Sequence, residues 1–372
     1  MLVVHCSGQP YEIGLAHGRA AASQVAACIA FYRAFFQRSA QLDWERVCEE
    51  AEKFLPYLER EWAGYVEEMR GLAEGAGQPF LSILALNVRT EIAYGMEKKK
   101  ENDGCTALSY YAEGSAYLAQ NWDWLPSQKA NLVACHITQR GMPSISMITE
   151  AGIIGKIGLN DHSVAVTLNA IRAVGVRFDA LPTHLALRAA LEAESRALAV
   201  ERLETAGLAA ACHILVADGS GPAIGLECTT KDVVRVENNG GPGCVVHTNH
   251  FLVAHKGLDD PCILWKDSVP RLERIKVLVG QAKAKGEVKM EDIELMLEDE
   301  EGFPTSICRQ VDLKKEWTSS TLFSIVMDLK RGEARVREGR PVRAEGELLL
   351  KPTSLQSRTF GVHIPYACHE RS

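Results

Sequence analysis

The sequence of 372 residues has no apolar run as long as a membrane span, no block of like charges and no internal repeat. A membrane-spanning helix needs about 20 mostly apolar residues, so we expect no membrane partner. The formal charge of −7 is dispersed, and the one basic run, Lys98–Lys100, is followed by acidic residues. This pattern argues against a nucleic-acid partner.

The sequence also lacks the features of an exported chain. No positively charged start leads into a long apolar segment, so we expect no signal peptide. The 11 cysteines are odd in number and show no framework spacing, which fits reduced thiols in the cytoplasm. The ending Glu370-Arg-Ser372 does not match a peroxisomal Ser-Lys-Leu address.

Two kinds of hydrophobic pattern follow each other along the chain. Up to residue 104 the apolar residues recur at helical spacing, and we expect helices over 19–38, 44–76 and 82–94. After Cys105, short apolar runs alternate with turn residues and are interrupted by helical stretches near 182–206 and 268–297. This order predicts an α+β fold with two antiparallel sheets between helical layers.

The step from Gly104 to Cys105 marks the change of pattern and resembles a self-cleavage site. If this bond breaks, Cys105 starts a chain, so that one residue carries both a thiol nucleophile and an α-amine base. The pKa of an α-amine, about 8, lies close to that of a thiol, so a proton can pass between them. Gly104 tolerates the strained backbone that attack on its own carbonyl requires.

A return strand ending at Asp123 is expected to complete a hairpin with the strand that Cys105 begins. Asp123 would then lie beside Cys105, where a carboxylate can orient the α-ammonium group. The alternative interpretation is structural: Cys105 begins a strand and Asp123 ends one. Gly243-Cys244 shows that a Gly-Cys step also occurs elsewhere in this chain.

Several ordered motifs resemble the acyl-coenzyme A:6-aminopenicillanate acyltransferase family of N-terminal-nucleophile hydrolases. The matching stretches include Asp103-Gly-Cys-Thr-Ala107, Gln120-Asn-Trp-Asp-Trp124, His247-Thr-Asn-His250 and Ser306-Ile-Cys-Arg309. The resemblance implies a four-layer αββα sandwich. It also implies that residues 1–104 form a small subunit, retained after cleavage, and that 105–372 form the large catalytic subunit.

The resemblance further implies roles for single residues. Cys105 would be the nucleophile, Asn249 would supply an amide to the oxyanion, and Arg309 would hold a substrate carboxylate. Asn169 matches an active-site asparagine of related bile-salt and penicillin-V hydrolases. The remaining substrate-binding candidates are Trp124 and Leu125, which would line the acyl pocket, and Thr229. Thr229 stands where the penicillin enzyme has a serine, so the resemblance does not establish the penicillin nucleus as the substrate.

We therefore expect a self-processing acyltransferase or amidohydrolase that forms a thioester at Cys105 and passes the acyl group to a small amine or to water. No cofactor is expected, although acyl-coenzyme A can serve as donor. The pair His247 and His250 does not predict a metal, because residues three apart on a strand point to opposite faces. The alternatives are a plain amidohydrolase without coenzyme A, a Cys-His protease, and a non-catalytic metabolite-binding relative.

Overall fold

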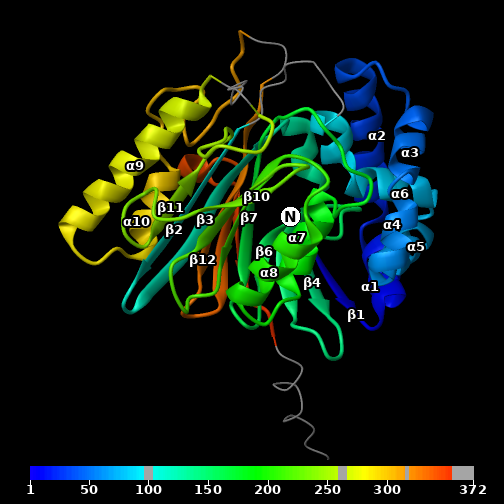
Figure 1. The fold of residues 1–372 in the computed structure, drawn as a ribbon, viewed down its shortest axis with the longest axis horizontal. Helices are drawn as coiled ribbons and strands as arrows, with labels where there is room; N and C mark the ends of the chain where they lie inside the picture. The colour runs from blue at the N-terminus through cyan, green and yellow to red at the C-terminus, as the bar shows by residue number, and fades with distance from the viewer. Residues whose placement is uncertain (96–103, 259–265, 315–317, 354–372) are drawn as a thin grey trace, which may run out of the picture.

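Two β-sheets stack face to face, and helices cover both outer faces (Figure 1). The computed structural model describes residues 1–95, 104–258, 266–314 and 318–353. The basic run Lys98–Lys100 and Asp103 therefore lie outside the described residues. The layer order helix, sheet, sheet, helix confirms the predicted α+β sandwich.

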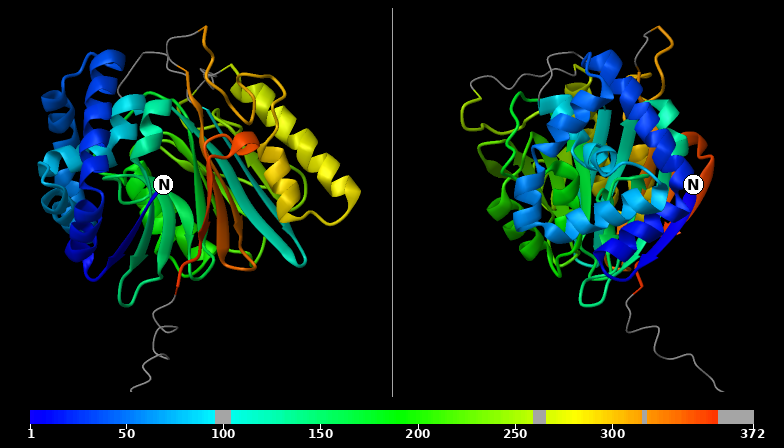
Figure 2. Two further views of the ribbon diagram at one scale, coloured as in Figure 1. Left: turned by 180° about the vertical axis from the view of Figure 1, so that it is seen from behind. Right: turned by 90° about the vertical axis from the view of Figure 1, so that its right-hand side faces the viewer.

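The outer helices form two groups on opposite sides of the molecule, as the left view in Figure 2 shows. One group packs on the eight-stranded sheet: α1 (Pro10–Ala20), α2 (Ala22–Ser39), α3 (Trp44–Glu52), α4 (Leu55–Glu61), α5 (Ala63–Ala76), α6 (Phe80–Asn87), α7 (Thr183–Leu191) and α8 (Arg196–Ala206). The other group, α9 (Ser268–Lys285) and α10 (Met290–Leu297), packs on the six-stranded sheet. Among the described residues, no helix is both long and apolar enough to cross a membrane.

The eight-stranded sheet contains one parallel pair. Its strands, in spatial order, are β1 (Leu2–Ser7), β4 (Leu132–Thr138), β5 (Ile145–Glu150), β6 (Ile157–Asn160), β7 (Ala165–Ala170), β8 (Cys212–Ala217), β9 (Ile224–Cys228) and β10 (Val233–Val236). β1 runs parallel to β4, whereas the sequence predicts only antiparallel strands. β1 and β4 are joined by all the N-terminal helices, so no short hairpin fixes their relative direction.

The six-stranded sheet carries the Gly104–Cys105 step. Its order is β11 (Cys244–His247), β2 (Gly104–Ala112), β3 (Ser115–Trp124), β12 (Ser320–Asp328), β13 (Glu333–Glu338) and β14 (Gly346–Leu350). β2 and β3 form the predicted hairpin and lie in the interior of the sheet. Both outer faces of this hairpin are covered, one by the other sheet and one by α9 and α10, so Cys105 begins a strand that is buried on both sides.

The predicted helix over 44–76 is wrong as a single element. It is broken into α3, α4 and α5, because Pro56 stands in the first turn of α4 and Trp62 has a non-helical backbone (φ −134°). A proline has no N–H for the helical ladder and begins a helix more readily than it continues one. Helix α1 and strands β1, β6 and β14 are elements that the sequence patterns did not predict.

The N-terminal segment packs closely within itself and against the remainder of the chain. Helices α1 and α5 touch backbone to backbone, because a Cβ on Gly14 or Gly71 would lie 1.8 or 2.0 Å from a carbonyl oxygen of the other helix. Glu68 of α5 forms two hydrogen bonds of 2.9 Å with Arg188 of α7, and both side chains are buried. The described residues 1–95 are therefore part of the folded core.

Candidate active site

Cys105 lies at the start of β2, with 2% of its surface exposed. In the β2–β3 ladder Cys105 is opposite Trp122 and Gly104 is opposite Asp123. Opposite residues place their side chains on the same face of a sheet. Trp122 contacts Lys156, which immediately precedes β6, so the Cys105 side chain faces the eight-stranded sheet and Asp123 lies on the other face of the hairpin.

The guanidinium group of Arg309 packs directly over Gly104. A Cβ at position 104 would lie 2.5 to 2.7 Å from Nη2, Nε and Cζ of Arg309, so any larger residue there would force the strand or Arg309 to shift. Arg309 Nε lies 3.4 Å from Asp123 Oδ2, and Nη2 forms an ion pair with Asp267. Arg309 is 2% exposed. In this chain it therefore contacts the residue before Cys105.

Asp123 is held by groups from two further segments. Its Oδ1 accepts a hydrogen bond of 2.7 Å from the hydroxyl of Thr321 in β12, and Oδ2 faces Arg309. Its relative exposure is 0%. The carboxylate is thus fixed opposite Gly104, at the position where cleavage would release the α-amine of Cys105.

Asn249 turns its amide oxygen toward Cys105. Oδ1 accepts a hydrogen bond of 2.8 Å from the backbone N–H of Cys105, and Nδ2 donates to the carbonyl of Ala170 at 3.0 Å. These partners define which side of the amide is oxygen. A side-chain amide carries two N–H donors, so one remains beyond the bond to Ala170, and the predicted oxyanion role of Asn249 requires that second donor.

The structure adds Arg271, which the sequence analysis did not identify. Arg271 lies on α9; its Nη1 donates to the carbonyl of Cys105 at 2.7 Å and to Thr106 Oγ1 at 3.1 Å. Its Nη2 donates to Asn249 Oδ1 at 2.8 Å. The sequence does carry one signal for it. Arg271 falls at helical spacing among the apolar residues Leu272 and Ile275, so it lies on the buried face of α9, where a charged residue is unusual.

Asp267 joins the two guanidinium groups of the site. It pairs with Arg271 at 3.2 Å and with Arg309. Burial raises the pKa of the Asp267 carboxyl, but Arg271 and Arg309 outweigh it, and the net pKa is lowered. The Gly104–Cys105 bond is thus surrounded by a chain of alternating charges: Asp123, Arg309, Asp267 and Arg271. Burial lowers the pKa of Arg271.

A second buried charge lies on the Cys105 side of the hairpin. Lys156 Nζ lies 3.8 Å from the centroid of the Trp122 ring and forms an ion pair with Glu150. Glu150 also binds Arg89 and Tyr32 of the N-terminal segment. Burial lowers the pKa of Lys156 to about 8, although Glu150 acts in the opposite direction.

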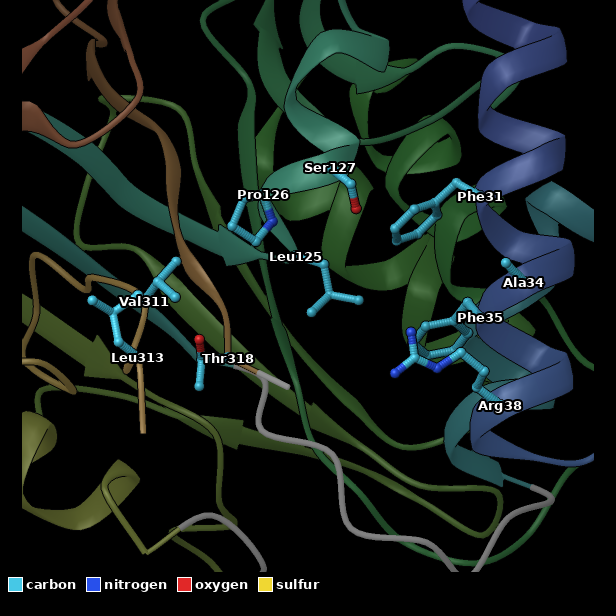
Figure 3. Close-up of a pocket in the computed structure, with 10 residues that line it drawn as sticks. All are labelled: Phe31, Ala34, Phe35, Arg38, Leu125, Pro126, Ser127, Val311, Leu313 and Thr318. Carbon is cyan, nitrogen blue, oxygen red and sulfur yellow. The ribbon is translucent and has the colours of Figure 1, made fainter. Parts of the chain in front are cut away.

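A cavity of about 410 Å³ opens beyond the end of β3 (Figure 3). Leu125 lines it together with Phe31 and Phe35 of α2, while Val311 and Leu313 form the opposite side. Trp124 is not among the lining residues, but its ring packs 5.5 Å from that of Phe35. The cavity therefore lies next to the strand that pairs with Cys105, and most of its lining residues are apolar, with Arg38, Ser127 and Thr318 as the polar ones.

Asn169 and Thr229 have partners other than Cys105. Asn169 on β7 donates to the carbonyl of His247 at 3.3 Å, and its oxygen lies 3.1 Å from His213 Nδ1. It is adjacent to Ala170, which binds Asn249. The Thr229 hydroxyl donates to Asp232 at 2.6 Å within a turn, so the described contacts do not bring Thr229 to the site.

His247 and His250 also have separate surroundings. His247 Nε2 lies 2.8 Å from Glu227, and His250 Nδ1 lies 2.7 Å from Ser268 Oγ. Burial lowers the pKa of His250 to about 4. Within the ranges that the structure describes, no three His, Cys, Asp or Glu side chains are grouped as metal ligands.

The chain resembles known proteins over nearly its whole length. A profile of the family described as acyl-coenzyme A:6-aminopenicillanic acid acyl-transferase matches residues 111–343, beginning just after Cys105. The 40 kDa form of the acyl-coenzyme A:6-aminopenicillanic-acid-acyltransferase of Emericella nidulans is 36% identical over 364 residues, covering 96% of this chain and 98% of that protein.

Two solved structures show more distant similarity. A conjugated bile acid hydrolase from Clostridium perfringens has a TM-score of 0.49 at 13% identity, covering 66% of this chain and 92% of its own. Penicillin V acylase from Agrobacterium tumefaciens has a TM-score of 0.37 at 12% identity, covering 69% of this chain and 80% of its own.

The family match and the relative from Emericella nidulans cover most of the chain. They confirm the predicted resemblance and the prediction of an enzyme of the acyltransferase type. The chain belongs to the acyl-coenzyme A:6-aminopenicillanic acid acyl-transferase family.

Proposed function

We propose that Cys105 is an N-terminal nucleophile that first cleaves its own chain and then carries an acyl group as a thioester. The observation that carries this proposal is the setting of the Gly104–Cys105 bond. Arg309 covers Gly104, Asn249 accepts from the Cys105 N–H, and Asp123 lies opposite Gly104.

Self-cleavage would proceed by an N-to-S acyl shift. The sulfur of Cys105 attacks the carbonyl carbon of Gly104, the C–S bond forms, and the C–N bond breaks. The thiol proton ends on the released α-amine. Water then attacks the thioester, which gives the Gly104 carboxylate and returns the thiol. Asn249 Oδ1 already binds the leaving nitrogen at 2.8 Å, so it can hold that nitrogen through the step.

In the cleaved enzyme the α-amine of Cys105 would act as the base. It takes the thiol proton as the sulfur attacks the acyl donor, and gives a proton to the departing group. Asp123 can orient the amine from its position opposite Gly104. The second Nδ2 proton of Asn249 can stabilise the oxyanion, and loss of one such donor typically costs about 3 kcal/mol of barrier.

The cavity beside Leu125 is our proposed acyl pocket. Its lining by Phe31, Phe35 and Leu125 suits an apolar acyl group. Two walls come from different parts of the chain, since Phe31 and Phe35 belong to the N-terminal segment. Retention of residues 1–104 after cleavage is therefore part of the proposal, and the Glu68–Arg188 pair and the β1–β4 pairing support it.

The acyl donor would be an acyl-coenzyme A thioester or an amide, and the acceptor a small amine or water. The name of the relative from Emericella nidulans gives acyl-coenzyme A and 6-aminopenicillanic acid as its substrates. That pair of substrates is accordingly the first to test, with hydrolysis of the same donors measured in parallel.

The test is the intact mass of the purified chain beside its Cys105→Ala variant. The wild type is expected to give two fragments whose masses sum to 40.8 kDa plus one water, while the variant stays whole. Incubation with an acyl-coenzyme A should then add one acyl mass to the fragment that begins at Cys105. If the wild type stays whole and takes up no acyl group, the proposal is wrong and a binding role is favoured.

A further inference from the structure

Arg271 is the only described side chain on α9 that reaches the backbone of Cys105. It is 2% exposed and its Nη1 and Nη2 donate to three acceptors, in Cys105, Thr106 and Asn249. A buried arginine is costly unless its donors and its charge are matched. The guanidinium of Arg271 has hydrogen-bond partners on both terminal nitrogens, and these partners include the backbone of Cys105 and its neighbour Asn249. This arrangement indicates a role in holding the site as well as in packing.

The first consequence of these bonds is geometric. Arg271 Nη2 and the Cys105 N–H share one acceptor, Asn249 Oδ1, at 2.8 Å each. Arg271 therefore helps to keep Asn249 Oδ1 facing the backbone nitrogen of Cys105 and Asn249 Nδ2 facing the carbonyl of Ala170. The planar fork of arginine can bind the carbonyl of Cys105 and the Asn249 oxygen together, which a lysine cannot do.

The second consequence is electrostatic. The described charged and titratable groups around Cys105 are Asp123, Asp267, Arg271, Arg309, His250 and the ion pair of Lys156 with Glu150. In the uncleaved chain the two aspartates match the two arginines. Cleavage adds an α-amine beside this chain of charges, and an adjacent guanidinium disfavours its protonation while favouring a thiolate.

We infer that Arg271 is a positioning residue of this site. Its guanidinium fixes the carbonyl of Cys105 and the orientation of Asn249, and its charge keeps the thiol and α-amine of Cys105 reactive near neutral pH. The inference rests on the proposed function of Cys105 as nucleophile. It adds a residue outside the sequence motifs that led to that proposal.

The experiment compares the wild type with Arg271→Met, Arg271→Lys and Arg274→Met. Arg274 lies on the same helix, is a quarter exposed and pairs with Asp299 and Glu301, so it is the matched control. The rate of self-cleavage is followed by intact mass after cell-free synthesis. The pH dependence of Cys105 alkylation by iodoacetamide is followed by mass spectrometry of the Cys105 peptide, and needs no substrate.

We expect Arg271→Met to slow cleavage at least about tenfold and to raise the midpoint of the alkylation curve by about 1 pH unit. Arg271→Lys should keep the midpoint near that of the wild type but cleave slowly, because it retains charge and loses the fork. Arg274→Met should match the wild type in both. An unchanged rate and midpoint in Arg271→Met would overturn the inference.

The remaining outcomes are also decisive. If Arg271→Met fails to fold by circular dichroism, Arg271→Lys decides, and wild-type cleavage in that variant would overturn the inference. If the wild type itself does not cleave, the proposed function fails. The alkylation curve then still tests Arg271 in the intact chain, where its contact with Cys105 is already present.

Discussion

Replacing Gly104 by alanine tests whether the close fit of Arg309 over the residue before the proposed cleavage point affects cleavage. An added Cβ would lie 2.5 Å from Arg309 Nη2, well inside the normal contact distance of about 3.4 to 4 Å between such atoms. The guanidinium cannot easily retreat, because it is paired with Asp123 and Asp267. Relief of the contact therefore requires a shift of about 1 Å, in the strand or in Arg309.

A displacement of that size at a reacting centre can lower a rate by about a hundredfold. We expect Gly104→Ala to fold, because the strain is local, but to self-cleave about a hundred times more slowly than the wild type. The assay is a time course of cell-free synthesis, stopped in denaturant, with the uncleaved fraction read by intact mass. Circular dichroism and thermal unfolding establish that the variant is folded.

The matched control is Gly280→Ala on α9, where an added Cβ would meet no atom within 4 Å. This variant should cleave at the wild-type rate. Cleavage of Gly104→Ala at the same rate as Gly280→Ala would refute the reasoning, since the predicted contact with Arg309 would then have no effect on the Gly104–Cys105 bond.

Three further predictions concern the pocket, the fold and pH. Phe31→Ala should raise KM for an apolar acyl donor about tenfold and leave kcat within twofold, in steady-state kinetics, because the ring lines the cavity but not the thiol; a change in kcat alone would contradict this. Arg188→Met should lower the free energy of unfolding in urea by about 3 to 5 kcal/mol, because Glu68 is left buried without its partner, and adding Glu68→Leu should recover most of the loss; an equal loss in the double variant would contradict it. Burial lowers the pKa of His255, but hydrogen bonds to the carboxylates of Glu227 and Asp232 outweigh burial, and the net pKa is raised. Protonated His255 therefore stabilises the folded state: this contribution is complete below the unfolded pKa of about 6.5 and is lost as pH rises through the folded pKa. The urea midpoint of the wild type should therefore fall more steeply across that range than that of His255→Gln, and parallel curves would contradict this.

The hairpin at the site could be predicted from the sequence because its determinants are local. Alternating apolar residues and the Glu113-Gly114 turn fix β2 and β3, and they place Asp123 near Cys105 as expected. The layer order could also be predicted, since helical and strand-like patterns occupy separate parts of the chain. The break between α3 and α4 has a local signal in Pro56, which the helical spacing of the apolar residues over 44–76 does not reflect.

The contacts that surround Cys105 could not be predicted in the same way. Arg309 lies over Gly104 and Arg271 binds the Cys105 carbonyl, although more than 160 residues separate Arg271 from Cys105. No periodic pattern encodes which buried arginine meets which carbonyl, because such a pairing depends on the final packing of α9 on the sheet. The resemblance assigned Arg309 to a substrate carboxylate, and its described partners are Asp123 and Asp267.

The alternating row Asp123, Arg309, Asp267 and Arg271 has a consequence for how this family can vary. Loss of any one member leaves an unmatched charge in a largely buried region, and an unmatched buried charge is destabilising. A tolerated change at one of these positions therefore calls for an opposite change at its neighbour. Related sequences are expected to inherit the four residues as a single unit, or to replace them in oppositely charged pairs.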